Sequence, residues 1–179
     1  MSQKAYIERV LKRYAMHNYK PGNTPVAKGD KFSLSQCPKN DYERRKIQNI
    51  SYASAVGSLI HAQVCMCPDI VYITGMLGRY MSNQGLDHWT TAKRVMWYLQ
   101  KMKDYMLTYW MSSKLEIVGY TDSDFAGCQD SMKSTSGFIF LMAGGAISWK
   151  SSKQTVMASS TMAAEFMACY EASNYGIWL

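Results

Sequence analysis

The chain has 179 residues, of which 47% are hydrophobic and 18% are charged, and its formal net charge is +7. This composition is that of a globular protein of one or two small domains. It excludes a disordered chain, because enough apolar surface exists to offset the entropy lost on folding. No apolar run is long enough for a transmembrane helix, and the basic N-terminal sequence lacks the apolar segment of a signal peptide. We therefore expect an intracellular protein, in the cytoplasm or nucleus, that does not associate with membranes.

Four helices are predicted in the first part of the chain, each from apolar residues at helical spacing. Their bounds are 2–18, 41–66, 68–82 and 87–102. The first begins at Ser2 as an N-cap, and the third begins at Pro68, a residue well tolerated in a first helical turn. Residues 19–41 are rich in Pro and Gly and predict an extended linker. Together the helices predict a small bundle.

Residues that favour β-structure become frequent after residue 105, so residues 1–104 and 105–179 are expected to form separate domains. Strands are predicted at 107–110, 115–121, 138–142 and 147–150, and the third of these is apolar enough to be buried on both faces. Gly144 and Gly145 predict a tight two-residue turn between the last two strands, because glycine accepts positive φ. Residues 159–161 then cap a final helix that reaches the C-terminus. The predicted fold class is mixed, α/β (α+β).

Charge differs between the two parts of the chain. Residues 1–115 carry 17 Lys and Arg against 7 Asp and Glu, whereas residues 116–179 carry 3 against 6. This distribution suits a phosphate-binding part joined to a metal-binding part, and a solvated basic surface gives the same pattern. The five cysteines lack the spacing of a zinc site, so reduced and mostly buried thiols are predicted.

Two acidic segments are candidates for chemistry. Residues 119–127 read G-Y-T-D-S-D-F-A-G, which places Asp122 and Asp124 two positions apart and on one face of a strand. Such a pair either holds a divalent cation or simply forms a turn at the strand end. Glu165 lies in the early turns of the final helix, where an acid interacts with the helix dipole or supplies another metal ligand.

Three further motifs follow residues 119–127 in a fixed order. They are K-S-T-S-G at 133–137, G-G-A-I-S-W-K-S-S-K-Q at 144–154 and S-T-M-A-A-E-F at 160–166. The four motifs together resemble the ribonuclease H domain of Ty1/copia-type retrotransposon Pol polyproteins. The preceding sequence is similar to the end of the family's reverse transcriptase, at residues 52–59, 68–70 and 88–99. The resemblance covers essentially the whole chain.

This resemblance implies a helical C-terminal region of a reverse transcriptase, thumb- or connection-like, over residues 1–104. Over residues 105–179 it implies a truncated ribonuclease H-like mixed sheet with a C-terminal helix. Asp122 and Glu165 match the first two acids of the family's catalytic set, and Asp124 is auxiliary. Enzymes of this family cut the RNA strand of an RNA–DNA hybrid with two Mg²⁺ ions.

The family takes its remaining acids from sequence that corresponds to positions beyond residue 179. We therefore expect the chain to be inactive as it stands, and its strand bearing Asp122 to offer an open edge for self-association. Polymerase activity is not expected, because the sequence lacks the adjacent Asp-Asp pair that it requires.

Two other functions are compatible with the sequence. The basic part could bind nucleic acid without catalysis, with Trp89, Trp97 and Tyr98 either stacking on bases or forming the core. The candidate phosphate contacts are Lys93, Arg94, Lys101 and Lys133. Residues 9–12, R-V-L-K, are similar to the R-x-L-R motif of secreted pathogen effectors, which would make the chain an interaction protein.

Overall fold

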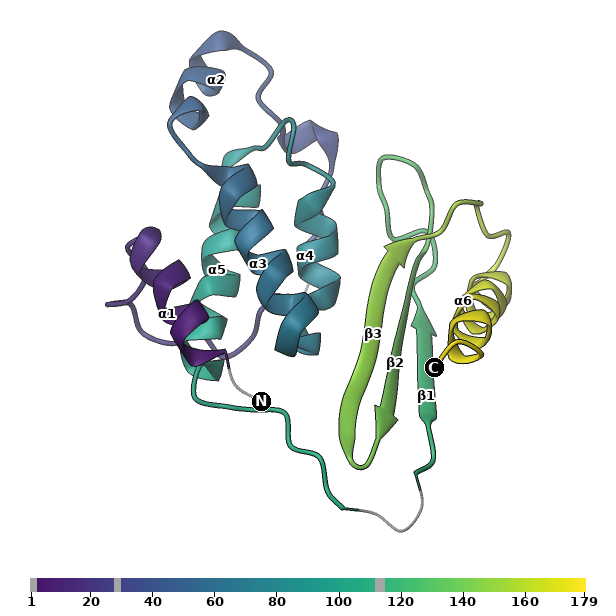
Figure 1. The fold of residues 1–179 in the computed structure, drawn as a ribbon. Helices are drawn as coiled ribbons and strands as arrows, with labels where there is room; N and C mark the ends of the chain where they lie inside the picture. The colour runs from purple at the N-terminus through teal and green to yellow at the C-terminus, as the bar shows by residue number, and fades with distance from the viewer. Residues whose placement is uncertain (1–2, 28–29, 112–114) are drawn as a thin grey trace. The chain divides into compact units, whose positions relative to one another are not determined.

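The computed structural model describes residues 3–27, 30–111 and 115–179, and it divides into two compact units. The helical unit is Met1–Met106, and the sheet unit is Leu107–Leu179. Helices fill the first unit, whereas an antiparallel sheet followed by a helix forms the second (Figure 1). The predicted mixed fold class with a C-terminal helix is confirmed. In the described ranges, no helix is both long enough and apolar enough to cross a membrane.

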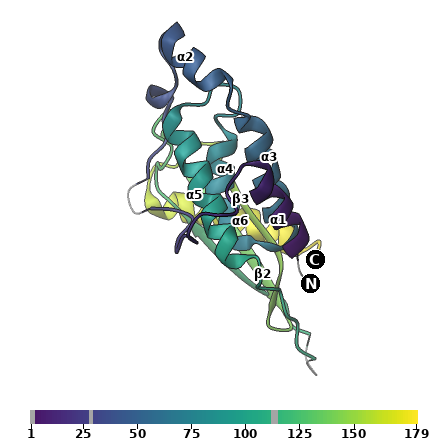
Figure 2. The same ribbon diagram turned by 90° about the vertical axis from the view of Figure 1, so that its left-hand side faces the viewer.

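Short 3-10 segments separate the helices of the helical unit. In chain order the elements are α1 (Lys4–Arg13), η1 (Leu34–Gln36), α2 (Asp41–Gln48), α3 (Tyr52–Met66), η2 (Pro68–Ile70), α4 (Val71–Gly78) and α5 (Leu86–Met102). Figure 2 shows α5 running alongside α3 and α4. The predicted bundle is therefore observed, and α5 matches its predicted range within one residue.

Three predicted helix boundaries are wrong. The first helix ends at Arg13 and not near Asn18, because Ala15 adopts a φ of 55° and the chain turns back on itself. The helix predicted over residues 41–66 is divided between α2 and α3 by residues 49–51. Asn and Ser in this break favour local hydrogen bonds over a continuous helix. The third predicted helix ends with α4 at Gly78 and not at residue 82. The predicted start at Ser2 lies outside the described residues.

The core of the helical unit lies where α3, α4 and α5 meet. Tyr52, Leu59, Ile73 and Leu99 are each at most 1% exposed. Full burial of such apolar side chains contributes roughly 1.5–3 kcal/mol each. The Tyr52 hydroxyl donates to the Leu77 carbonyl at 2.8 Å, which satisfies the one polar group that Tyr52 takes into the core.

The sheet unit is a three-stranded antiparallel sheet covered by one helix. Its elements are β1 (Val118–Ser123), β2 (Thr135–Met142), β3 (Gly145–Lys153) and α6 (Thr161–Gly176), with strand order β1-β2-β3. The α6 helix packs on β1 and β2 (Figure 1). The centroid of the Tyr175 ring lies 4.9 Å from that of Phe138 and 6.2 Å from that of Phe140. The prediction that residues 138–142 are buried on both faces is wrong. Among these five residues only Phe140 is buried, because α6 covers one face.

The segment before β1 also differs from its prediction. Residues 107–110 form no strand, and β1 begins at Val118 instead of residue 115. The segment lies against the β2–β3 turn, where the Tyr109 hydroxyl donates to the Ala146 carbonyl at 2.8 Å. This approach requires a glycine at position 145, since a β carbon there would lie 2.7 Å from the Tyr109 ring.

The turn between β2 and β3 consists of Ala143 and Gly144, not of the predicted Gly144–Gly145 pair. Met142 pairs directly with Gly145, and φ is 51° at Ala143 and 76° at Gly144. Positive φ at both central residues defines a type I′ turn. For an alanine this left-handed conformation costs about 1–2 kcal/mol.

We expect Ala143→Asn to stabilise the sheet unit by about 1 kcal/mol, because Asn tolerates positive φ and Asn-Gly is the favoured type I′ pair. Gly144→Ala is the matched control and should destabilise, since its new β carbon would lie 2.8 Å from the Trp110 ring. Urea denaturation followed by near-ultraviolet circular dichroism measures both effects. An Ala143→Asn variant no more stable than the parent chain would show that the turn is unstrained.

All five cysteines are reduced thiols, as predicted. Cys37, Cys67 and Cys128 are buried, whereas Cys65 and Cys169 are exposed. Burial, followed by the charges of Asp69 and Cys65, raises the pKa of the Cys67 thiol to about 11. Because the thiolate is the reactive form, both the burial of Cys67 and its protonated state protect the thiol from alkylation.

Iodoacetamide at mildly alkaline pH should therefore alkylate Cys65 and Cys169 well before Cys67. Because a raised pKa lowers the thiolate fraction, labelling of Cys67 should still increase as the pH approaches 11. Peptide mass spectrometry of timed samples measures the order, and denaturation in urea is the control, since it should remove the difference. Equal labelling of Cys65 and Cys67 in the folded chain would contradict the burial of Cys67.

Candidate functional site

The acidic motif lies at the C-terminal end of β1. Asp122 is exposed, and its Oδ1 accepts the N–H of Ser123 at 2.9 Å. Asp122 is paired with Gly137 on β2. A β carbon added to Gly137 would approach only the Lys150 carbonyl, at 3.6 Å, so the sheet face shared by Asp122 and Gly137 is open at this point.

The opposite face of β1 lies under α6. Gly119 pairs with Phe140, and added β carbons on Gly119 and on Gly176 of α6 would lie 2.6 Å and 3.2 Å from the Phe140 ring. Because side chains alternate along a strand, Gly119, Thr121 and Ser123 face α6, and Asp122 faces away from it.

Asp124 follows the end of β1 and closes the loop that leads to β2. Its Oδ1 accepts the N–H of Thr135 at 2.5 Å, and its own N–H donates to the Thr135 carbonyl at 3.1 Å. A β carbon on Gly127 would lie 2.0 Å from the Asp124 carboxylate, so Gly127 leaves the space that this carboxylate occupies. Asp124 thus fastens the first motif to the K-S-T-S-G motif, and its carboxylate is engaged with the backbone of Thr135.

Gln154, at the end of the third motif, joins three elements through its buried amide. The side chain is 1% exposed. Its Nε2 donates to Ser123 Oγ of β1 at 3.3 Å, Ser136 Oγ of β2 at 2.8 Å and the Ala164 carbonyl of α6 at 2.9 Å. Because an amide has two donor hydrogens, the longest of these contacts shares a hydrogen with another. Gln154 therefore fixes the end of β1 and the start of α6 relative to each other.

Glu165 is half-buried in the second turn of α6. The helix begins as predicted, with the Ser160 hydroxyl accepting the N–H of Ala163 at 3.1 Å. Ala164, Ala168 and Ala172 form its buried stripe, and Glu165 flanks that stripe.

The structure therefore brings together the backbone segments that carry Asp122 and Glu165. Each acid is next to a residue bound by Gln154: Ser123 follows Asp122, and Ala164 precedes Glu165. The alternation of β1, however, directs Asp122 away from α6. The pairing of the two carboxylates around a cation stays a prediction drawn from the family resemblance.

Carboxylate oxygens are ligands that Mg²⁺ prefers, so Asp122 and Glu165 suit the ion in chemical type. Two carboxylates are too few for a two-ion centre, because two ions that act together require several acidic ligands. Across the described ranges, no group of three or more His, Cys, Asp or Glu side chains is placed to hold a metal ion. These residues do not form a complete two-magnesium centre.

The basic candidates for phosphate contact are largely engaged within the chain. Arg94 pairs with the Asp30 carboxylate, Lys101 Nζ donates to Asn23 Oδ1 at 3.2 Å, and Lys133 Nζ donates to the Thr155 carbonyl. Lys93 is half-buried on α5. These contacts order the loops around α5 and β3, and they compete with any phosphate for the same cations.

The aromatic candidates divide between the core and its surface. Trp89, Trp97 and Tyr98 are all partly buried against the helical core. Burial and the neighbouring Asp69 carboxylate raise the pKa of Tyr98 to about 12, so its hydroxyl remains a donor to that carboxylate. Trp89 also lines a cavity.

Residues 9–12 lie within α1, where two of the four side chains point into the core. Val10 is 5% exposed and Leu11 is 1% exposed. The run therefore has a packing role in the fold, and its leucine is not accessible in the folded helical unit.

Comparison with known proteins places the chain among retrotransposon sequences. It is 42% identical, over its whole length, to the Retrovirus-related Pol polyprotein from transposon TNT 1-94 of Nicotiana tabacum, of which it covers 13%. It is 31% identical, again over its whole length, to the Retrovirus-related Pol polyprotein from transposon RE2 of Arabidopsis thaliana, of which it covers 12%. Over 74% of its length it is 38% identical to Secreted RxLR effector protein 161 of Plasmopara viticola, of which it covers 94%.

The chain belongs to the family of Ty1/copia-type retrotransposon Pol polyproteins. The whole chain is matched, but it spans only about an eighth of the length of these polyproteins. No protein-family model and no solved structure matches the chain.

Gln154 belongs to the third sequence motif, but the sequence alone predicted no role for it. The signal that could have found it was the polar pair Lys153-Gln154 at the end of a strand, since only one of the two can turn inward. Ser123 and Ser136 were missed for a different reason. Their pairing across β1 and β2 depends on the sheet register, which the sequence did not define.

Gln154→Glu should destabilise the sheet unit by about 3 kcal/mol, because a buried carboxylate would face the Ser and carbonyl oxygens that now accept from the amide. Gln129→Glu is the matched control, since Gln129 is exposed, and it should change stability by less than about 0.5 kcal/mol. Chemical denaturation with hydrogen exchange of the β2 amides measures the loss. Equal effects of the two substitutions would show that Gln154 does not hold the unit together.

Proposed function

We propose that the sheet unit is the N-terminal part of a ribonuclease H-like domain, and that the helical unit is the thumb- or connection-like end of a reverse transcriptase. One observation carries the proposal. The four motifs fall on a β1–β2–β3 meander followed by α6, with Asp122 at the end of β1 and Glu165 in the second turn of α6. The similarity of the whole chain to copia-type Pol polyproteins supports its origin in such a polyprotein.

In this proposal the ancestral activity is hydrolysis of the RNA strand of an RNA–DNA hybrid. Asp122 and Glu165 are the two family acids that this stretch supplies for Mg²⁺, and Gln154 is a positioning residue that holds their backbone segments together. Asp124 maintains the loop between β1 and β2. Since two acids leave a pair of magnesium ions short of ligands, we propose that this stretch by itself cleaves hybrids little or not at all.

A nucleic-acid-binding role without catalysis is the second candidate. The positive charge of residues 1–115 supports it, because such charge attracts phosphates at long range. The ion pair of Arg94 with Asp30 and the contact of Lys101 with Asn23 leave these two cations less available to bind phosphate.

An effector role through residues 9–12 is not supported by their placement. Leu11 is buried in the helical core, and a linear motif must be exposed to be recognised. The similarity to an RxLR effector protein of Plasmopara viticola extends over 133 residues and therefore reflects much more than this short run.

The decisive experiment compares the chain alone with an extended chain. The extension is the segment that follows the matched region in the tobacco Pol polyprotein, fused after Leu179. With a labelled RNA–DNA hybrid and Mg²⁺, we expect no cleavage by the chain alone and measurable cleavage by the extended chain. In the extended chain, Asp122→Asn and Glu165→Gln should each lower the rate at least about a hundredfold, because both acids would hold metal.

Asp130→Asn in the exposed loop before β2 is the matched control and should leave cleavage unchanged. Strong cleavage by the unextended chain that Asp122→Asn abolishes would contradict the proposed inactivity. Cleavage by the extended chain that neither acid affects would contradict the assignment of Asp122 and Glu165.

A further inference from the structure

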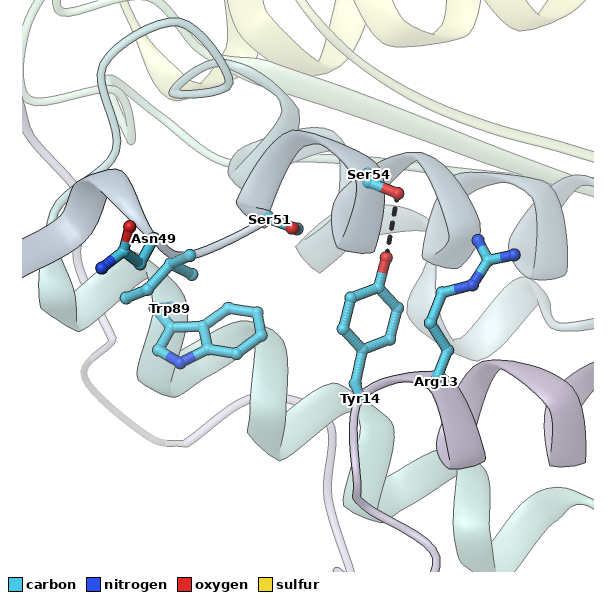
Figure 3. A pocket seen from close by; sticks show the side chains of 7 residues that line it. Arg13, Tyr14, Asn49, Ser51, Ser54 and Trp89 are labelled. Atoms are coloured by element: carbon cyan, nitrogen blue, oxygen red, sulfur yellow. Dashed lines mark hydrogen bonds between the residues drawn. The ribbon is translucent and has the colours of Figure 1, made fainter.

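A cavity of about 320 Å³ opens in the helical unit where α1, the α2–α3 break, α3 and α5 meet (Figure 3). Its size is at the lower end of the range for ligand pockets, roughly 300–1,000 Å³. The lining residues are Arg13, Tyr14, Asn49, Ile50, Ser51, Ser54 and Trp89. They come from four separate parts of the unit, so the cavity exists only in the folded chain.

Two features of the backbone create this cavity. The left-handed residue Ala15 ends α1 directly after Tyr14, and the break at residues 49–51 separates α2 from α3. Tyr14 is held across the gap, because its hydroxyl donates to Ser54 Oγ at 3.0 Å. Its ring meets Trp89 edge to face, with centroids 6.4 Å apart at 67°. The aromatic wall is therefore already formed in the free chain.

The polar groups of the lining are available for a ligand. Asn49 and Ser51 make no side-chain hydrogen bond with the rest of the described chain, and the Ser51 hydroxyl does not cap α3. Within the same described ranges no ion pair neutralises Arg13. The lining contains no Asp or Glu. The cavity is therefore positively charged, with unused donors and acceptors.

In Figure 3 the Tyr14 ring lies between the Arg13 side chain and the Trp89 indole. An indole face stacks on a nucleobase, and a guanidinium forms paired hydrogen bonds with a phosphate. A simple anion would use only Arg13, and an apolar ligand would leave Arg13, Asn49 and Ser51 unpaired. A nucleotide unit offers a base to Trp89, a phosphate to Arg13 and hydrogen-bonding groups to Asn49 and Ser51.

We propose that this cavity binds one nucleotide unit of a single-stranded nucleic acid, with its base against Trp89 and its phosphate at Arg13. The proposal rests on the nucleic-acid-binding role proposed above as the second candidate, and it uses neither Asp122 nor Glu165. It also locates nucleic-acid binding at residues other than Arg94, Lys101 and Lys133, whose cationic groups have partners within the chain.

The test is fluorescence anisotropy of a labelled oligothymidine titrated with the full chain in the absence of Mg²⁺. Arg13→Gln and Trp89→Leu should each raise Kd about tenfold, since each removes one of the two main contacts. Arg9→Gln is the matched control, because it removes the same charge from α1 outside the cavity, and it should change Kd less than about twofold. Trp89→Phe keeps an aromatic face and should keep most of the affinity, which separates stacking from a loss of folding.

Competition defines the ligand further. Thymidine monophosphate should displace the labelled strand, whereas inorganic phosphate at the same concentration should not. Equal competition by phosphate, equal weakening by Arg9→Gln and Arg13→Gln, or no measurable binding would overturn the proposal. Asp122→Asn should leave Kd unchanged, so a failure of the ribonuclease assignment and a failure of this site give different results.

Discussion

The sheet unit depends on one buried amide. Gln154 stands where β1, β2 and α6 converge, and its Nε2 is the donor for acceptors from all three. A buried polar group of this kind stabilises only when its partners are in place, so the three elements are coupled. The acids named by the family resemblance are one residue away from two of these acceptors. The position of the end of β1 relative to the start of α6 therefore depends on the Gln154 side chain.

The same region shows how residues of one motif serve different purposes. Asp122 is exposed and free of the β1–β2 loop, whereas Asp124 is engaged by the Thr135 backbone. The structure explains why they are not equivalent. Asp122 lies within β1 and follows the alternation of its side chains. Asp124 lies beyond the end of β1 and closes the loop to β2. In the helical unit, the chain breaks around residues 15 and 49–51 likewise do more than end helices, because they create the cavity at Trp89.

Much of the fold followed from periodicity, and the exceptions have physical causes. The range of α5 was predicted within one residue, because its apolar positions recur regularly over four turns and more. The break at residues 49–51 was missed, since a helical pattern continues through it. Residues 107–110 were predicted as a strand from their β-forming side chains, but they have no strand partner and lie against a turn instead. The turn lies one residue earlier than predicted, because Met142 pairs with Gly145 across the two strands.

The sequence by itself determined the family, the mixed fold class and the identity of the candidate acids, because these depend on residue types in a fixed order. Only the tertiary structure decided the sheet register, the direction of Asp122 and the central place of Gln154. Register and side-chain direction arise from pairing between strands that are far apart in the chain. The residue pattern of one segment cannot predict the register or the side-chain direction, since both depend on two paired strands and on the helix that covers those strands.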